Sequence, residues 1–127
     1  MLGEKKLVGF VATTDFARAR AFYGDVLGLK FLKDDGFALV FEASGVMVRV
    51  AKVPGEFKPA PYTVLGWEVS AIEDVVRGLT ARGVTFERFG FFQQDELGVW
   101  AAPGGDKVAW FKDPDGNMLS LSQHVGR

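Results

Sequence analysis

The chain has 127 residues, a formal net charge of −1 at pH 7 and no cysteine. Its length predicts a single domain, 1–127, and its scattered Lys and Arg residues argue against nucleic acid or a membrane as a partner, which leaves small molecules. Without cysteine, disulfides, thiolate metal ligands and a cysteine nucleophile are excluded. We expect no secretory leader and no membrane span, and therefore a cytoplasmic location.

The first half predicts a strand, a helix and three further strands. Residues 7–12 form the first strand, and Thr13-Thr14-Asp15 caps a helix over 16–27 that Gly28 ends. Strands follow at 29–32, 37–42 and 46–51, with a two-residue turn at Ser44-Gly45 before the last of them. That turn places alternate residues of the last two strands on one mixed face, namely Val40, Glu42, Met47, Arg49 and Ala51.

The second half repeats this order after a linker at about 52–61, which holds three of the five prolines. A strand is expected at 63–69, followed by a capping box at Ser70-Ala-Ile-Glu73 and a helix that ends at Gly83. Strands at 84–89 and 98–102 enclose a polar loop, 93–96. The half ends in a β-hairpin.

This hairpin spans 108–123 and turns at Asp113-Pro114-Asp115-Gly116. Counting outward from a four-residue turn places Phe111 opposite Met118. The core face then holds Val108, Trp110, Leu119 and Leu121, and the mixed face holds Ala109, Phe111, Met118, Ser120 and Ser122. Trp100 falls opposite Ala109, also on the mixed face.

The two halves therefore predict an α+β fold of two βαβββ repeats, at about 5–53 and 62–125. The short strands form a curled mixed sheet of two half-barrels, and the helices lie outside it.

Three features of the sequence form a pattern. They are the opening strand, the helix that follows Asp15 and carries Ala21-Phe22-Tyr23 and Leu27-Gly28, and the terminal run Asp113-Pro114-Asp115-Gly116-Asn117. This pattern resembles the vicinal oxygen chelate superfamily, which includes glyoxalase I, bleomycin resistance proteins and extradiol dioxygenases. The resemblance covers 7–123 and implies a homodimer. It does not choose a function, because this fold hosts enzymes and binders alike.

The resemblance also implies one divalent metal, held by His, Glu or Gln at cleft positions of four strands. These positions fall on Val8, Arg49, Val64 and Ser120. None suits a divalent metal, so we expect no metal and no cofactor. His124 is the only histidine, so a two-His-one-carboxylate iron site cannot form within one chain. We expect His124 at a strand end, in solvent. A displaced site using Glu42, Glu68 and His124 is the alternative.

Alternation along the strands predicts a ligand cleft that is mainly apolar and aromatic. Its expected ligand-binding residues are Phe10, Glu42, Met47, Arg49, Glu68, Trp100, Phe111 and Ser120. Trp100 and Phe111 either offer flat faces to an aromatic or cationic ligand or simply pack the interior. Arg49 either anchors a carboxylate or phosphate or forms an ion pair with Glu42 or Glu68.

The favoured function is a small-molecule-binding protein of the glyoxalase or bleomycin-resistance type that lacks the metal and sequesters its ligand. No catalytic residue is predicted, since Glu68 as a lone general base is a weak signal. The alternative is a metal-dependent lyase, isomerase or dioxygenase with displaced ligands. A third possibility is an accessory module that binds a protein partner.

Overall fold

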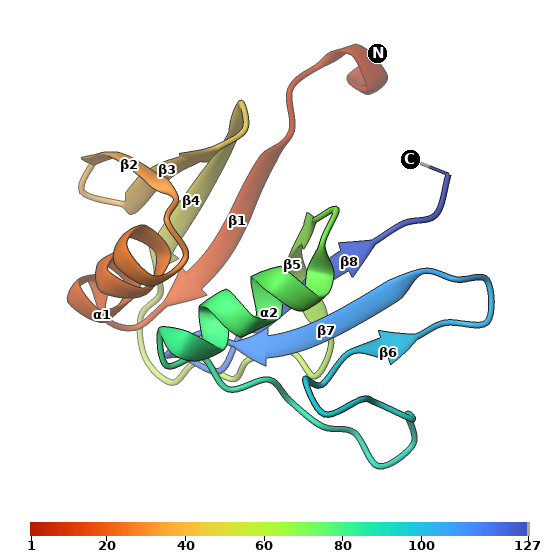
Figure 1. Ribbon diagram of the computed structural model, residues 1–127. Coiled ribbons are helices and arrows are strands. Elements are labelled where there is room, and N and C mark those ends of the chain that lie inside the picture. The colour runs from red at the N-terminus through yellow and green to blue at the C-terminus, as the bar shows by residue number, and fades with distance from the viewer. Residues whose placement is uncertain (127) are drawn as a thin grey trace. The chain divides into compact units, whose positions relative to one another are not determined.

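The computed structural model describes residues 1–126 and contains two compact units, divided after Lys58. Each unit has a four-stranded mixed sheet and a helical segment (Figure 1). The division lies within the segment that the sequence predicts as a linker. No helix in the described part of the chain is long and apolar enough to cross a membrane.

The first unit begins with a single 3-10 turn, Leu2–Glu4, and its sheet has the strand order β1-β4-β3-β2. The strands are β1 (Val8–Thr13), β2 (Lys30–Asp34), β3 (Ala38–Ala43) and β4 (Val46–Lys52). β1 runs parallel to β4, and the other pairs are antiparallel.

The sequence predicts one continuous helix over 16–27. In the structure this segment is only partly α-helical. It consists of α1 (Phe16–Arg20) and a π-helical continuation, Ala21–Val26. Asp15 caps it as predicted, because its carboxylate accepts a hydrogen bond from the N–H of Arg18 at 3.1 Å. Gly28 follows with a φ of 79°, the left-handed conformation that ends many helices.

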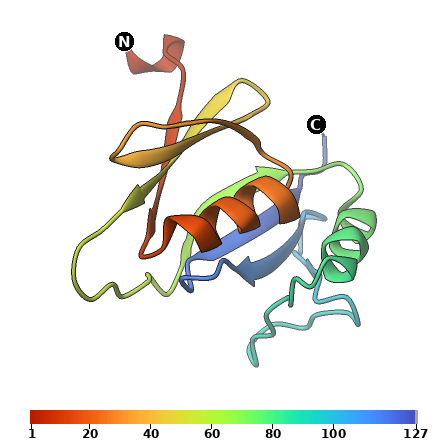
Figure 2. The same cartoon turned by 90° about the vertical axis from the view of Figure 1, so that its left-hand side faces the viewer.

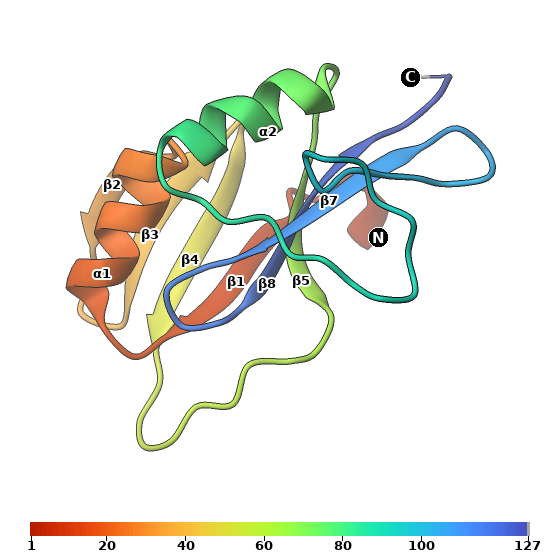
Figure 3. The same ribbon diagram turned by 60° about the horizontal axis from the view of Figure 1, so that its bottom comes forward.

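The hairpin of β3 and β4 has the predicted register, and its strands appear in yellow tones in Figure 2. Ser44 and Gly45 both have positive φ, at 49° and 83°, which is the pattern of a type I′ turn. Phe41 therefore faces Tyr23 of the helical segment, with ring centroids 6.1 Å apart, and both side chains are fully buried. Figure 3 shows α1 along this face of the sheet.

The second unit repeats the arrangement, with the strand order β5-β8-β7-β6. Its elements are β5 (Thr63–Glu68), α2 (Ile72–Ala81), β6 (Trp100–Ala101), β7 (Lys107–Lys112) and β8 (Met118–Gln123). β5 is parallel to β8, as β1 is to β4. The predicted α+β duplication is therefore confirmed.

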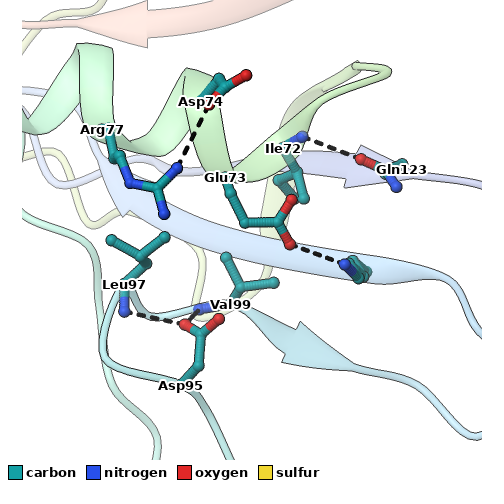
Figure 4. A network of polar contacts seen from close by, with 9 residues as sticks. Ile72, Glu73, Asp74, Arg77, Asp95, Leu97, Val99 and Gln123 are labelled. Atoms are coloured by element: carbon teal, nitrogen blue, oxygen red, sulfur yellow. Dashed lines mark hydrogen bonds and ion pairs between the residues drawn. The ribbon is translucent and has the colours of Figure 1, made fainter.

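The predicted capping box before α2 is wrong. Ala71 occupies the N-cap and provides no side-chain hydrogen bond. Gln123 of β8 replaces it, because its Oε1 accepts a hydrogen bond from the N–H of Ile72 at 2.9 Å (Figure 4). Glu73, the expected second member of the box, instead accepts a hydrogen bond from Nζ of Lys107 at 2.8 Å.

The terminal hairpin is shifted by one residue from the predicted register. The N–H of Asp113 donates to the carbonyl of Asn117, so the loop holds three residues rather than four. Gly116 takes a φ of 87° and its N–H donates to the carbonyl of Asp113, as in a type I turn followed by a left-handed residue. Phe111 consequently faces Leu119 instead of Met118.

The segment 85–99 is mostly irregular, contrary to the predicted strand at 84–89, and β6 is shorter than the predicted 98–102 (Figure 3). Phe86 forms one isolated bridge with Phe111. The amide of Gln94 accepts from the N–H of Phe89 and donates to the carbonyls of Glu87 and Gly98. These bonds satisfy backbone groups without a β-ladder partner.

Candidate functional site

The open face of each sheet is the face turned away from the helix and is the candidate binding surface. In the first unit, Phe10 pairs with Arg49, and Val8 pairs with Met47, which in turn pairs with Glu42. Because paired residues point to the same side, four predicted ligand-binding residues share this face. Its members are Val8, Phe10, Ala12, Val40, Glu42, Met47, Arg49 and Ala51.

This face leaves a good deal of apolar surface accessible. Phe10 is 61% exposed, Val8 42% and Met47 39%. Val8, Glu42 and Met47 also line a cavity of about 220 Å³ near the first strand. Exposed apolar groups with a few polar side chains among them are typical of surfaces that bind other molecules.

Arg49 forms an ion pair with Asp35, and the predicted partners Glu42 and Glu68 are wrong. One terminal nitrogen of Arg49 lies 2.8 Å from Oδ2 of Asp35. This hydrogen bond, together with those from the N–H groups of Ala38 and Phe37, lowers the pKa of Asp35 to about 2. The carboxylate therefore stays charged and holds the guanidinium at the open face, where a quarter of the side chain is exposed.

The open face of the second unit differs from the predicted one because of the shifted hairpin. Trp110 pairs with Ser120, and Ser122 pairs with both Glu68 and Val108. The members of this face are Gly66, Glu68, Trp100, Val108, Trp110, Met118, Ser120 and Ser122. Three predicted residues, Glu68, Trp100 and Ser120, are therefore brought onto one face.

Phe111 does not belong to this face, contrary to prediction. It is fully buried on the helix side, where its ring stacks on Trp67 with centroids 6.3 Å apart. It also contacts the ring of Phe86 edge-on at 5.4 Å. The one-residue shift exchanges Phe111 for Trp110, since a slip by one residue turns every side chain of a strand to the other face.

An aromatic cluster covers part of this face and consists of Phe89, Phe91, Phe92, Trp100 and Trp110. The ring of Phe92 stacks on Trp110 at 5.2 Å with an interplanar angle of 4°, and lies 4.5 Å from Trp100. The two indoles are 6.2 Å apart. Sequence reasoning included only Trp100; the signal for the others was the run Phe89-Gly-Phe-Phe92 in an otherwise polar segment.

Ser120 lies against Gly66 of the neighbouring strand. A Cβ on Gly66 would come within 2.7 Å of Oγ of Ser120 and 3.3 Å of its carbonyl oxygen, so a larger residue here would require Ser120 to move. In the second unit, Ser120 of β8 pairs with Gly66 of β5. In the first unit, Arg49 of β4 pairs with Phe10 of β1 at the corresponding place. The two halves thus place different chemistry at equivalent positions.

The polar end of the second face centres on His124. Its Nδ1 lies 2.8 Å from Oδ2 of Asp106, and its Nε2 lies 2.9 Å from Oγ of Ser122. Hydrogen bonds from the N–H of Val125 and from His124 lower the pKa of Asp106. Glu68 and His124 line a depression of about 430 Å³ at this end.

Comparison with known proteins identifies the family. The sequence matches the Glyoxalase/Bleomycin resistance protein/Dioxygenase superfamily over residues 7–121. The chain belongs to this superfamily. No curated protein matches the glyoxalase-superfamily chain described here, but many solved structures do.

Three of these structures share the glyoxalase-superfamily fold at low identity. A superfamily member from Sphaerobacter thermophilus has a TM-score of 0.76 and 23% identity, covering 98% of this chain and 100% of its own. Lactoylglutathione lyase from Agrobacterium tumefaciens has a TM-score of 0.74 and 18% identity, covering 98% of each chain. A glyoxalase/bleomycin resistance protein/dioxygenase from Alicyclobacillus acidocaldarius has a TM-score of 0.70 and 15% identity, covering 96% and 92%.

The positions that the superfamily resemblance assigns to a metal do not fit one. Val8 and Val64 carry no lone pair, and Arg49 brings a positive charge that Asp35 already engages. Ser120 lies against Gly66 and offers only a neutral hydroxyl. Among residues 1–126, no group of three or more His, Asp or Glu side chains is arranged to hold a metal ion.

Proposed function

We propose that this glyoxalase-superfamily protein binds a small aromatic molecule on the open face of its second sheet and sequesters it without a divalent metal. The observation that carries the proposal is the pair of indoles, Trp100 and Trp110, held 6.2 Å apart on the open face of the second sheet. Flat, electron-rich indole faces attract aromatic rings and cations.

A fluorescence titration tests the binding. Bleomycin, a cationic aromatic compound, and 2-naphthoate, an anionic one, are added while tryptophan emission is followed. We expect saturable quenching by at least one probe, and a roughly fivefold to tenfold weaker affinity in Trp100→Leu, because a stacked aromatic contact contributes about 1 kcal/mol.

Phe37→Leu is the matched control for this titration, since Phe37 is 80% exposed and lies outside both open faces. Its affinity should equal that of the wild type. Equal weakening in both variants, or no saturable quenching by either probe, would refute binding at the indole pair.

Elemental analysis and thermal unfolding test the absence of a metal. The purified protein should contain no stoichiometric metal, and Ni²⁺, Zn²⁺, Mn²⁺ or Fe²⁺ should not raise its melting temperature, because an ion that binds only the native state must stabilise it. A stoichiometric ion that raises the melting temperature would instead favour a metal-dependent lyase, isomerase or dioxygenase using Glu42, Glu68 or His124.

The proposal includes a homodimer located in the cytoplasm. Exposed apolar residues on the first sheet, such as Phe10 and Val8, are the kind of surface that a second subunit covers. Light scattering coupled to size-exclusion chromatography should give twice the chain mass, and a monomer mass at micromolar concentration would contradict it.

A further inference from the structure

A continuous hydrogen-bonded chain links Ser122, His124 and Asp106 in the second unit. Oγ of Ser122 lies 2.9 Å from Nε2 of His124, and Nδ1 of the same ring lies 2.8 Å from Oδ2 of Asp106. A hydroxyl, an imidazole and a carboxylate in this order form the constellation by which serine nucleophiles are activated, irrespective of fold.

The carboxylate determines the direction of these bonds. An ionised Asp106 can only accept, so Nδ1 of His124 carries the proton that it shares with Asp106. Nε2 then presents a lone pair, to which the hydroxyl of Ser122 donates. Asp106 is itself held in place, since its other oxygen accepts a hydrogen bond from the N–H of Val125 at 2.9 Å.

A small molecule can reach this group of residues. The side chains of His124 and Asp106 are each 38% exposed, and Ser122 is half-buried on the open face. His124 also lines the depression of about 430 Å³, together with Glu68, Val69, Ser70 and Gln123.

We propose that Ser122 is the nucleophile of a metal-independent acyl-transfer site with His124 as general base and Asp106 as positioning residue, and that its substrates are carboxylic esters. This activity goes beyond ligand sequestration and uses none of the aromatic cluster.

The reaction needs no reagent besides water. Oγ of Ser122 bonds to the ester carbonyl carbon, its proton passes to Nε2 of His124, and the bond to the leaving oxygen breaks as that proton is delivered to the departing alcohol. Water then attacks the acyl-serine, His124 takes one of its protons and returns it to Oγ, and the carboxylic acid departs.

Two probes test the proposal on the purified full-length chain. With 4-nitrophenyl acetate we expect release of nitrophenol above the buffer rate. With a fluorophosphonate, which bonds to a nucleophilic serine and expels fluoride, we expect one label, located at Ser122 by peptide mass spectrometry. Both reactions should fall about 100-fold or more in Ser122→Ala and His124→Gln, which remove the nucleophile and the base.

Thr80→Ala is the matched control, because it removes a hydroxyl from an exposed position of α2 in the same unit, outside both open faces. It should react like the wild type. A label on another residue, no label at all, or equal reactivity of Ser122→Ala and the wild type would overturn the proposal. Tryptophan quenching by bleomycin or 2-naphthoate should be unchanged in Ser122→Ala, so this result is independent of ligand binding.

The role of Asp106 has its own measurement. Asp106→Glu keeps a carboxylate for Nδ1 and should label faster than Asp106→Asn, although both variants alter the contact with Val125. Equal labelling rates in the two variants, at matched melting temperatures, would exclude a positioning role.

Discussion

Replacing Phe92 by alanine removes the central ring of the aromatic cluster. This ring contacts four others, with centroid separations of 4.5 Å to Trp100, 4.6 Å to Phe91, 5.2 Å to Trp110 and 6.1 Å to Phe89. The substitution therefore detaches the segment 85–99 from the indoles, because Phe92 stacks directly on Trp110.

The expected loss is about 2 kcal/mol of unfolding free energy. Each aromatic pair contributes about 0.5–1.5 kcal/mol. Because the Phe92 ring is only half-buried, we use the lower value of about 0.5 kcal/mol for each of its four pairs, which gives about 2 kcal/mol in total. Urea denaturation followed by circular dichroism gives this quantity, provided that the slope of the transition is unchanged. Near-ultraviolet circular dichroism should also weaken, since the indoles lose their stacked neighbour.

Phe91→Ala is the control for this change. Phe91 is 79% exposed and contacts only Phe89 and Phe92 among the described rings, so its removal should cost less than about 1 kcal/mol. Equal destabilisation by the two substitutions, or none by Phe92→Ala, would refute the view that stacking on the indoles orders this segment.

Three further substitutions probe features of the two sheets. Gly66→Ala should destabilise by about 1–3 kcal/mol through its clash with Ser120, and most of this loss should disappear in a Ser120→Ala background when both are measured in urea. Gln123→Ala removes the hydrogen bond at the start of α2 and should cost about 1 kcal/mol, measured in the same way; an unchanged midpoint would contradict the capping role. Because Arg49 and backbone N–H groups lower the pKa of Asp35 from 3.8 to about 2, this pair stabilises the fold above pH 3.8 and the contribution is lost as the pH falls toward 2; Asp35→Asn should flatten that part of the acid titration, and an unaltered profile would argue against the ion pair.

The two hairpins show how far local sequence determines strand register. Ser44-Gly45 admits one common two-residue turn, so counting outward placed Met47 and Arg49 on the correct face. The turn after Asp113 allows loops of three or four residues, and only the left-handed conformation of Gly116 decides between them. The residue types in this turn do not distinguish a three-residue loop from a four-residue loop. The resulting one-residue error in register places Phe111 on the wrong face of the sheet.

Non-local partners limited the prediction elsewhere. Asp35 lies 14 residues before Arg49, in the loop between β2 and β3, and Gln123 lies 51 residues after Ile72, the first residue of the helix that it caps. The strand prediction for 84–89 failed because tertiary stacking on Trp110 outweighs the local preference of β-branched and aromatic residues for strands. Alternation and turn chemistry carry no information about such partners.

The alternation along β4 and β8 has a consequence for how this protein can change. Val48 and Val50 belong to the buried core, whereas Met47 of the same strand and Phe10 of the neighbouring β1 reach the open face. Substitutions at the second set alter surface chemistry while the packing that maintains the fold stays constant. A combinatorial library at Phe10 and Met47 would therefore diversify recognition on an unchanged scaffold, which makes the open face of the first sheet an adjustable surface for engineering.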